Sequence, residues 1–196
     1  MNISMPVILA SASPRRQELL RLIFPSFEVC PSTAEEGLSE PVNIKPEELP
    51  EFWAYQKAKD IAERHPDALV IGSDTAVLVP VDESGKVKVL GKPHNTQEAV
   101  DMLRLLSGKE HQVVTACCIY IRGKGYCFTE TAKVSFYPLS EEEIETYVAT
   151  GEPMDKAGAY GVQGYGALLV KEIDGDFYTV MGLPVARLYR YLRQLL

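Results

Sequence analysis

The 196-residue chain lacks the features that mark membrane, secreted and nucleic-acid-binding proteins. No apolar run approaches the length needed to cross a bilayer, and no basic segment followed by an apolar core marks a signal peptide. The formal net charge of -7 argues against non-specific binding to nucleic acid, which needs a basic surface. With 46% hydrophobic and 24% charged residues, the composition is that of a globular protein. We therefore expect a cytoplasmic protein with neither nucleic acid nor a membrane as partner.

Cysteine and histidine are few, and their spacing fits no metal site. No C-x-x-C pair is present, and the histidines lack metal-ligand spacing. Cys117 and Cys118 are neighbours in a predicted strand, so their side chains should point to opposite faces. We expect buried free thiols, with neither a zinc site nor a disulfide framework. The residues concerned are Cys30, Cys117, Cys118, Cys127, His65, His94 and His111.

Three common nucleotide and hydrolase motifs are also missing. The chain has no G-x-x-x-x-G-K-[ST], which excludes a P-loop. The order Gly161-x-x-Gly164-x-Gly166 reverses the dinucleotide-binding fingerprint and precedes a predicted strand instead of following one. The G-x-S-x-G elbow of α/β hydrolases is absent.

The opening stretch S-x-S-P-R-R-x-E-L-L is the most informative part of the chain. Residues 6–10 form a short apolar run typical of a buried strand. Ser13 followed by Pro14 predicts a helix start with a hydroxyl cap. Arg15 and Arg16 would then lie at a helix N-terminus, where the helix dipole and the guanidinium groups favour phosphate. The alternative is an ordinary strand-to-helix turn with two solvated arginines.

Two carboxylates lie where predicted strands end. Glu36 follows a predicted strand at 27–33, where it is either a magnesium ligand or part of a solvated loop. The most apolar run, 68–71, predicts a central strand that ends in G-S-D-T. Gly72 would let the backbone approach a ligand, and Asp74 would emerge at the strand end as a catalyst or a turn former.

Two lysines could complete a phosphate site. Lys57 lies in a helix that ends near Arg64, and Lys92 follows Gly91 in a turn braced by a proline. Lys57 could instead be an exposed lysine without a role. Cations for phosphate together with carboxylates for Mg²⁺ are the minimum set for phosphoanhydride hydrolysis.

The remaining pattern predicts a mixed α/β fold with parallel units early and hairpins later. Residues 77–81 and 87–90 should form one hairpin, and 113–121 with 126–136 another. Asn95 or Thr96 should cap one helix, and an S-x-x-E box should begin the next at residue 140. Further on, four glycines within 158–166 indicate a loop with unusual φ angles or a close approach to a ligand.

Motifs along nearly the whole chain resemble those of the Maf family, the septum-formation-inhibitor-like nucleotide pyrophosphatases. Besides the opening stretch they are Y-Q-K-A-K, G-S-D-T, G-K-P, L-S-G-K-E-H-Q-V-V-T, G-E-P-M-D-K-A-G-A-Y-G-V-Q-G and G-L-P. The resemblance implies one Maf/ITPase-like α/β domain over 1–196, with an elongated mixed sheet flanked by helices. It also implies two lobes with a cleft for a nucleoside triphosphate, which is cut between its α and β phosphates.

The family's site residues carry over onto matching positions here. The resemblance implies substrate binding by Ser11, Arg16, Lys57 and Lys92 and a divalent cation, Mg²⁺ or Mn²⁺, at Glu36 and Asp74. Asp74 resembles the residue described as the proton acceptor, and the sequence leaves open whether it acts on water or holds the metal.

The branch of the family is indicated by three further residues. Arg15, Thr75 and Gln163 match the pattern of the dTTP/UTP branch, whereas the 7-methyl-GTP branch usually has Gln where Thr75 stands. Action on 7-methyl-GTP or on inosine or xanthosine triphosphate is the alternative, as is a non-catalytic nucleotide-binding regulator of cell division. Modified pyrimidine nucleotides as further substrates, and a homodimer, are left open.

Overall fold

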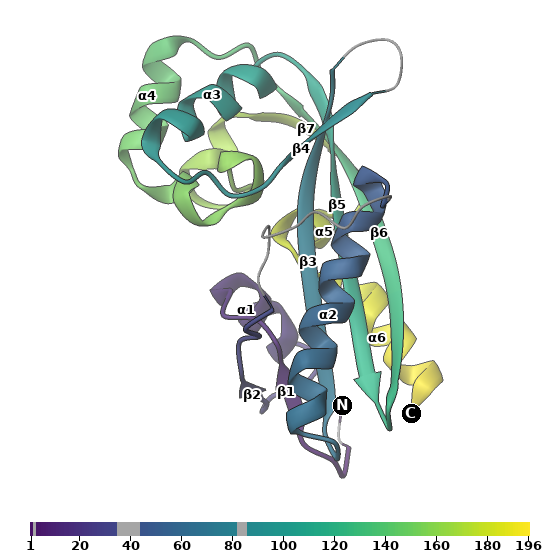
Figure 1. The fold of residues 1–196 in the computed structure, drawn as a ribbon. Helices are drawn as coiled ribbons and strands as arrows, with labels where there is room; N and C mark the ends of the chain where they lie inside the picture. Colours follow the sequence, from purple (N-terminus) through teal and green to yellow (C-terminus); the bar gives the residue numbers. More distant parts are fainter. Residues whose placement is uncertain (2, 35–43, 82–85) are drawn as a thin grey trace. The chain divides into compact units, whose positions relative to one another are not determined.

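The computed structural model describes residues 1, 3–34, 44–81 and 86–196, and it confirms a mixed α/β fold (Figure 1). In this part of the chain a seven-stranded sheet has the order β2-β1-β3-β5-β6-β7, and β4 pairs with β3. Helices flank the sheet. The strands are β1 (Val7–Leu9), β2 (Glu28–Val29), β3 (Leu69–Pro80), β4 (Val87–Leu90), β5 (Glu110–Ile121), β6 (Lys124–Phe136) and β7 (Val170–Asp174). The helices are α1 (Pro14–Arg21), α2 (Leu49–Arg64), α3 (Thr96–Leu106), α4 (Glu141–Ala149), α5 (Phe177–Met181) and α6 (Val185–Leu195), with 3-10 turns η1 (Pro46–Glu48), η2 (Glu152–Asp155), η3 (Ala157–Ala159) and η4 (Gly164–Leu168).

The chain divides into two compact units, each built from separate segments. Unit 1 comprises residues 1–74, 115–130 and 182–196, and unit 2 comprises 75–114 and 131–181. The long strands β3, β5 and β6 each contribute residues to both units. None of the helices formed by the described residues is long and apolar enough to cross a membrane.

In unit 1, strand β1 lies between β2 and β3 and runs parallel to both. Helix α2 packs on these strands through small side chains, and its Ala54 and Ala58 are fully buried in the core. Helix α6 lies along β6, where its Tyr191 contacts Phe128 with ring centroids 5.2 Å apart. This unit therefore stacks helices against a parallel β1–β3 pair, as the apolar runs predict.

Strand β3 differs from expectation because it does not end at G-S-D-T. It runs without a break from Leu69 to Pro80, and its antiparallel partner β4 pairs with the second half. Gly72 serves the packing of α2 and not the approach of a ligand: a Cβ there would lie 2.8 Å from the backbone nitrogen of Ala58. Gly72 therefore lets the helix lie against the strand, and Asp74 emerges from the middle of a strand.

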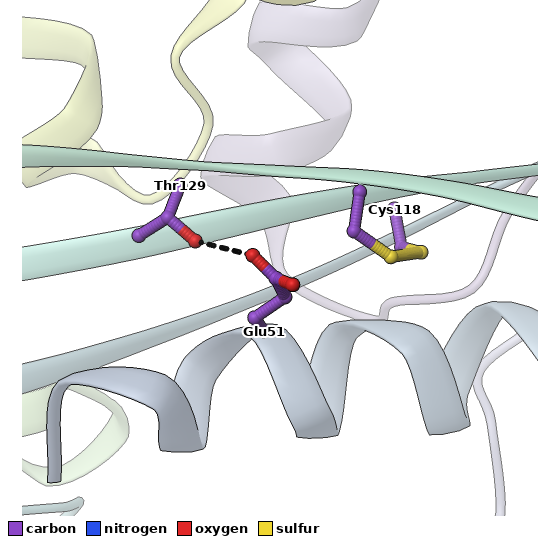
Figure 2. The surroundings of a disulfide bond; sticks show 4 residues. Glu51, Cys118 and Thr129 are labelled. Carbon is purple, nitrogen blue, oxygen red and sulfur yellow. Dashed lines mark hydrogen bonds between the residues drawn. A yellow bond between two sulfur atoms is a disulfide. The ribbon is translucent and has the colours of Figure 1, made fainter. Parts of the chain in front are cut away.

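Strands β5 and β6 form the predicted hairpin, but the prediction of free thiols is wrong for two of the four cysteines. Both residues of the tight turn, Arg122 and Gly123, have positive φ angles, as two-residue hairpin turns require. Cys118 on β5 and Cys127 on β6 are joined by a disulfide, with Cα atoms 4.1 Å apart (Figure 2). These two cysteines form no short-range sequence motif. The register of the hairpin places them opposite each other, so the sequence alone did not predict the disulfide.

The other two cysteines are free thiols as expected, but only Cys117 is buried and Cys30 is half-buried. Near the disulfide, the Thr129 hydroxyl donates a hydrogen bond to the Glu51 carboxylate at 3.0 Å (Figure 2). This bond ties β6 to the first turn of α2.

In unit 2, both predicted helix starts are confirmed. The Asn95 side chain accepts a hydrogen bond from the Glu98 N–H at 2.9 Å. Ser140 and Glu143 form the reciprocal capping box at the start of α4. Helices α3 and α4 pack against each other, and α3 also contacts η3.

Candidate active site

The most buried charges among the predicted site residues that the structure describes are Lys57 and Asp74, which form an ion pair. The Lys57 ammonium lies 2.6 Å from Oδ1 of Asp74, and the two residues are only 6% and 8% exposed. Lys57 comes from α2, one residue before Ala58, which packs on Gly72 of β3. The close approach of helix and strand therefore brings the two charges together. Lys57 is not the exposed lysine of the alternative interpretation.

Arg16 and Ser11 form a second pair at the junction of β1 and α1. The guanidinium Nη1 of Arg16 donates a hydrogen bond to the Ser11 hydroxyl oxygen at 3.1 Å. The predicted hydroxyl cap of α1 is wrong in detail: Ser13 occupies the cap position but makes no side-chain cap bond. Its N–H instead donates to Ser11 Oγ at 3.3 Å. The Ser11 hydroxyl oxygen thus accepts hydrogen bonds from two donors. Pro14, at the first helical position, has no N–H group that needs a partner.

A backbone carbonyl connects Arg16 to the residue before Asp74. The Gly182 carbonyl accepts hydrogen bonds from Nε of Arg16 at 2.9 Å and from the fully buried Ser73 hydroxyl at 3.0 Å. Cys117 lies against the same hydroxyl at 3.7 Å, and burial raises the pKa of its thiol to about 12. Cys117 is therefore a neutral packing residue and not a nucleophile.

Sequence reasoning missed Ser73 and Gly182 as positioning residues. Ser73 is a polar side chain within an otherwise apolar buried strand, which is a signal that it needs an internal partner. Gly182 belongs to the G-L-P motif, but nothing in the sequence indicates that its carbonyl faces Arg16. The 166 positions that separate these two residues explain why.

Among the described residues, five of the predicted site residues belong to unit 1 and three belong to unit 2. Ser11, Arg16, Lys57 and Asp74 belong to unit 1, as does Arg15 beside Arg16. Three more lie in unit 2, where Thr75 follows Asp74 on β3 and both Lys92 and Gln163 are exposed. Glu36 lies outside the described residues.

The donor chemistry at Asp74 fits a divalent cation held jointly with a substrate. The described residues contain no group of three or more His, Cys, Asp or Glu side chains that could hold a metal alone. Magnesium often binds through one or two carboxylates together with substrate phosphates. Asp74 is the described carboxylate of the candidate site that could take part in such binding.

The fold is similar to that of a solved structure, the Staphylococcus aureus Ham1 protein. The two share 15% sequence identity with a TM-score of 0.52, over 97% of this chain and 100% of that one. At this identity the likeness concerns the fold alone. It places the molecule in the same mixed α/β architecture.

Sequence comparison then gives the family. The model of the family described as Maf-like protein matches residues 6–195, and the chain belongs to this family. A protein of Bacillus velezensis named dTTP/UTP pyrophosphatase is 50% identical over 96% of this chain and 95% of its own length. A protein of Aquifex aeolicus with the same name is 49% identical over 97% of this chain and 96% of its own.

Proposed function

We propose that this protein is a nucleoside triphosphate pyrophosphatase that hydrolyses dTTP and UTP between the α and β phosphates. The observation that carries the proposal is the buried pair of Lys57 on α2 and Asp74 on β3, in the unit that also holds the Arg16–Ser11 pair. Such an arrangement offers cations to phosphate and a carboxylate to water or metal. Two relatives at about half identity, both named dTTP/UTP pyrophosphatase, support this substrate class.

The reaction needs an attacking water, a bound triphosphate and a place for one proton. Arg16 holds phosphate oxygens with its guanidinium, which Gly182 and Ser11 fix in orientation. The water oxygen bonds to the α phosphorus, the bond from the α phosphorus to the oxygen that it shares with the β phosphorus breaks, and pyrophosphate leaves with that oxygen. Asp74 either takes the proton of that water or would help to hold a divalent cation, and Lys57 keeps the Asp74 carboxylate in place. Lys92 is the further cation for the triphosphate.

Mg²⁺ or Mn²⁺ completes the proposed site, held by Asp74 and Glu36. When bound, such an ion neutralises phosphate charge and polarises the bond that breaks. Protein treated with EDTA should therefore be inactive and should recover on addition of either ion. Full turnover in the presence of the chelator would contradict the metal requirement.

Two further properties are proposals that accompany the reaction. We place the protein in the cytoplasm, where nucleoside triphosphates are used. We also propose a homodimer, which a measurement of the molecular mass in solution would test.

Identification of the products tests the reaction itself. The protein incubated with dTTP and Mg²⁺ should release dTMP and pyrophosphate in equal amounts. Release of dTDP and phosphate would show cleavage at the other bridge. Binding of dTTP without formation of any product would favour the alternative function, that of a non-catalytic nucleotide-binding regulator of cell division.

A further inference from the structure

The loop that carries Gln163 is held by a single carboxylate, that of Glu152. Oε2 of Glu152 accepts a hydrogen bond from the Tyr165 N–H at 2.9 Å, and Oε1 accepts one from the Gly166 N–H at 3.2 Å. Both donors are backbone groups within three positions of Gln163. The half-buried Glu152 begins η2, earlier in the same segment of unit 2.

Tyr147 extends this contact to the other side of Gln163. Its hydroxyl donates to Oε1 of Glu152 at 3.0 Å and accepts a hydrogen bond from the Gly161 N–H at 3.2 Å. Burial, aided by the charge of Glu152, raises the pKa of the Tyr147 phenol, so the group stays protonated and able to donate. Residues 161–166 are thus tied down before and after Gln163.

Two glycines of this loop are required by contacts within the protein. Gly164 has a φ of +66°, and a Cβ there would lie 2.5 Å from Oε2 of Glu152. A Cβ on Gly166 would collide with the Gly161 carbonyl oxygen. Unusual φ angles, one of the two expectations for this loop, are confirmed at Gly158 and Gly164, and these internal contacts give a reason for glycine at positions 164 and 166.

Gln163 itself is left outside this set of bonds. Its side chain is exposed, and it makes no cap bond to η4, the turn that it precedes. The loop is therefore fixed through its backbone, and the Gln163 amide does not serve to hold it.

We propose that Glu152 is a positioning residue for base selection, holding the backbone of 161–166 so that the Gln163 amide faces the pyrimidine. This inference rests on the proposed function and adds to it a residue that does not touch the substrate. A pre-positioned amide pairs with the base without first ordering its loop, whereas a mobile one loses discrimination between uracil or thymine and cytosine.

Selectivity is the first readout. In Glu152→Gln one of the two oxygens becomes an NH₂ group that faces a backbone N–H, so the loop loses part of its anchor. We expect the ratio of kcat/KM for dTTP to that for CTP to fall about tenfold, mostly through a higher KM for dTTP. Tyr147→Phe, a milder change, should lower the ratio less. Glu145→Gln on the exposed face of α4 is the matched control and should leave it unchanged.

Coupling to Gln163 is the second readout. Adding Gln163→Ala to Glu152→Gln should lower the ratio little further, because both changes remove the same contact. Fully independent effects, or an unchanged ratio in folded Glu152→Gln, would overturn the proposal.

Hydrogen exchange separates this inference from the proposed function. The amides of Tyr165 and Gly166 should exchange about tenfold faster in Glu152→Gln, while amides of β5 keep their rates. Unchanged exchange rates at these two amides would contradict the claim that Glu152 holds the loop, whichever nucleotide is the substrate. A wild-type protein without preference for dTTP would instead contradict the proposed selectivity, and with it the base-selecting role of Glu152.

Discussion

Among single side chains, the proposed catalytic residue Asp74 is buried and paired with Lys57. Its carboxylate neutralises the buried ammonium of Lys57. Removing one member of a buried pair leaves an uncompensated charge, which costs several kcal/mol in many proteins. A change at Asp74 is therefore expected to affect both chemistry and stability, and the two effects need separate measurements.

We predict that Asp74→Asn lowers kcat by about 10²–10⁴-fold, because the amide lacks the charge that takes a proton or holds a metal. The Asn oxygen can still accept a hydrogen bond from Lys57, so the protein should fold with reduced stability. Steady-state kinetics and urea unfolding measure the two effects. Asp67→Asn, at an exposed position, is the control, and near wild-type kcat in Asp74→Asn would end the assignment.

Arg16 offers a test of geometry as opposed to charge. Its Nε and Nη1 reach two different acceptors, Gly182 and Ser11, which one ammonium cannot reproduce. We predict that Arg16→Lys lowers kcat/KM about tenfold or more, whereas Arg190→Lys on the exposed side of α6 changes nothing. Unchanged kcat/KM would reduce Arg16 to a structural residue.

The residue types of the candidate site could be predicted from sequence, but their partners could not. Motif order singled out Lys57 and Asp74, yet their ion pair depends on how closely α2 approaches β3. That distance is set by Gly72, whose missing side chain was interpreted as room for a ligand. The contact between Arg16 and Gly182 joins the two ends of the chain and has no local signal.

Among the secondary-structure elements, those with local signals were predicted and those set by tertiary contacts were not. Capping at Asn95 and Ser140 depends on residues three positions apart, so sequence sufficed. The unbroken β3 depends on pairing with β4, and the disulfide Cys118–Cys127 depends on hairpin register. The residues G-S-D-T, which suggest a turn locally, are part of strand β3 because the second half of that strand pairs with β4.

Strand β5 is joined to the loop that follows η3 through a buried histidine. His111 Nε2 lies 2.7 Å from the Tyr160 hydroxyl, and its Nδ1 has no hydrogen-bond partner among the described residues. Phe136 packs against both rings. Burial lowers the pKa of His111 to about 4, so the folded protein keeps this histidine neutral.

This histidine predicts a pH dependence of stability. Between pH 6.5 and about 4 the unfolded chain binds a proton at His111 that the folded protein does not, so stability falls as the pH falls through this window. The slope is at most about 1.4 kcal/mol per pH unit. His111→Gln should show a smaller slope in urea unfolding, while the exposed His94→Gln keeps that of the wild type. Equal slopes in all three would contradict a neutral buried His111.

For the chain as a whole, the fold class was predictable because the motifs run in family order along nearly all of it. The boundaries between the two units could not be predicted from the sequence, because they fall within the strands β3, β5 and β6. The proposed phosphate-binding residues Ser11 and Arg16 fall in unit 1, and the proposed base-selecting residues Thr75 and Gln163 fall in unit 2. Lys92 of the phosphate-binding set falls in unit 2 and Arg15 of the base-selecting set falls in unit 1, so neither set is confined to one unit.

The central claim is hydrolysis of dTTP and UTP with selection of the base. Thymine and uracil present acceptor, donor and acceptor groups that one Gln amide can pair with, whereas cytosine has an amine and a bare ring nitrogen at the corresponding positions. A site built for such bonds rejects bases that leave its polar groups unpaired.

Pyrophosphate release from a panel of nucleoside triphosphates, with Mg²⁺ or Mn²⁺ present, tests this claim most directly. The account predicts that kcat/KM for dTTP and UTP exceeds that for CTP, ATP, GTP, ITP, XTP and 7-methyl-GTP, and that Gln163→Ala narrows the gap. Equal rates on all common triphosphates, a preference for 7-methyl-GTP or a purine analogue, or binding without pyrophosphate release would contradict it.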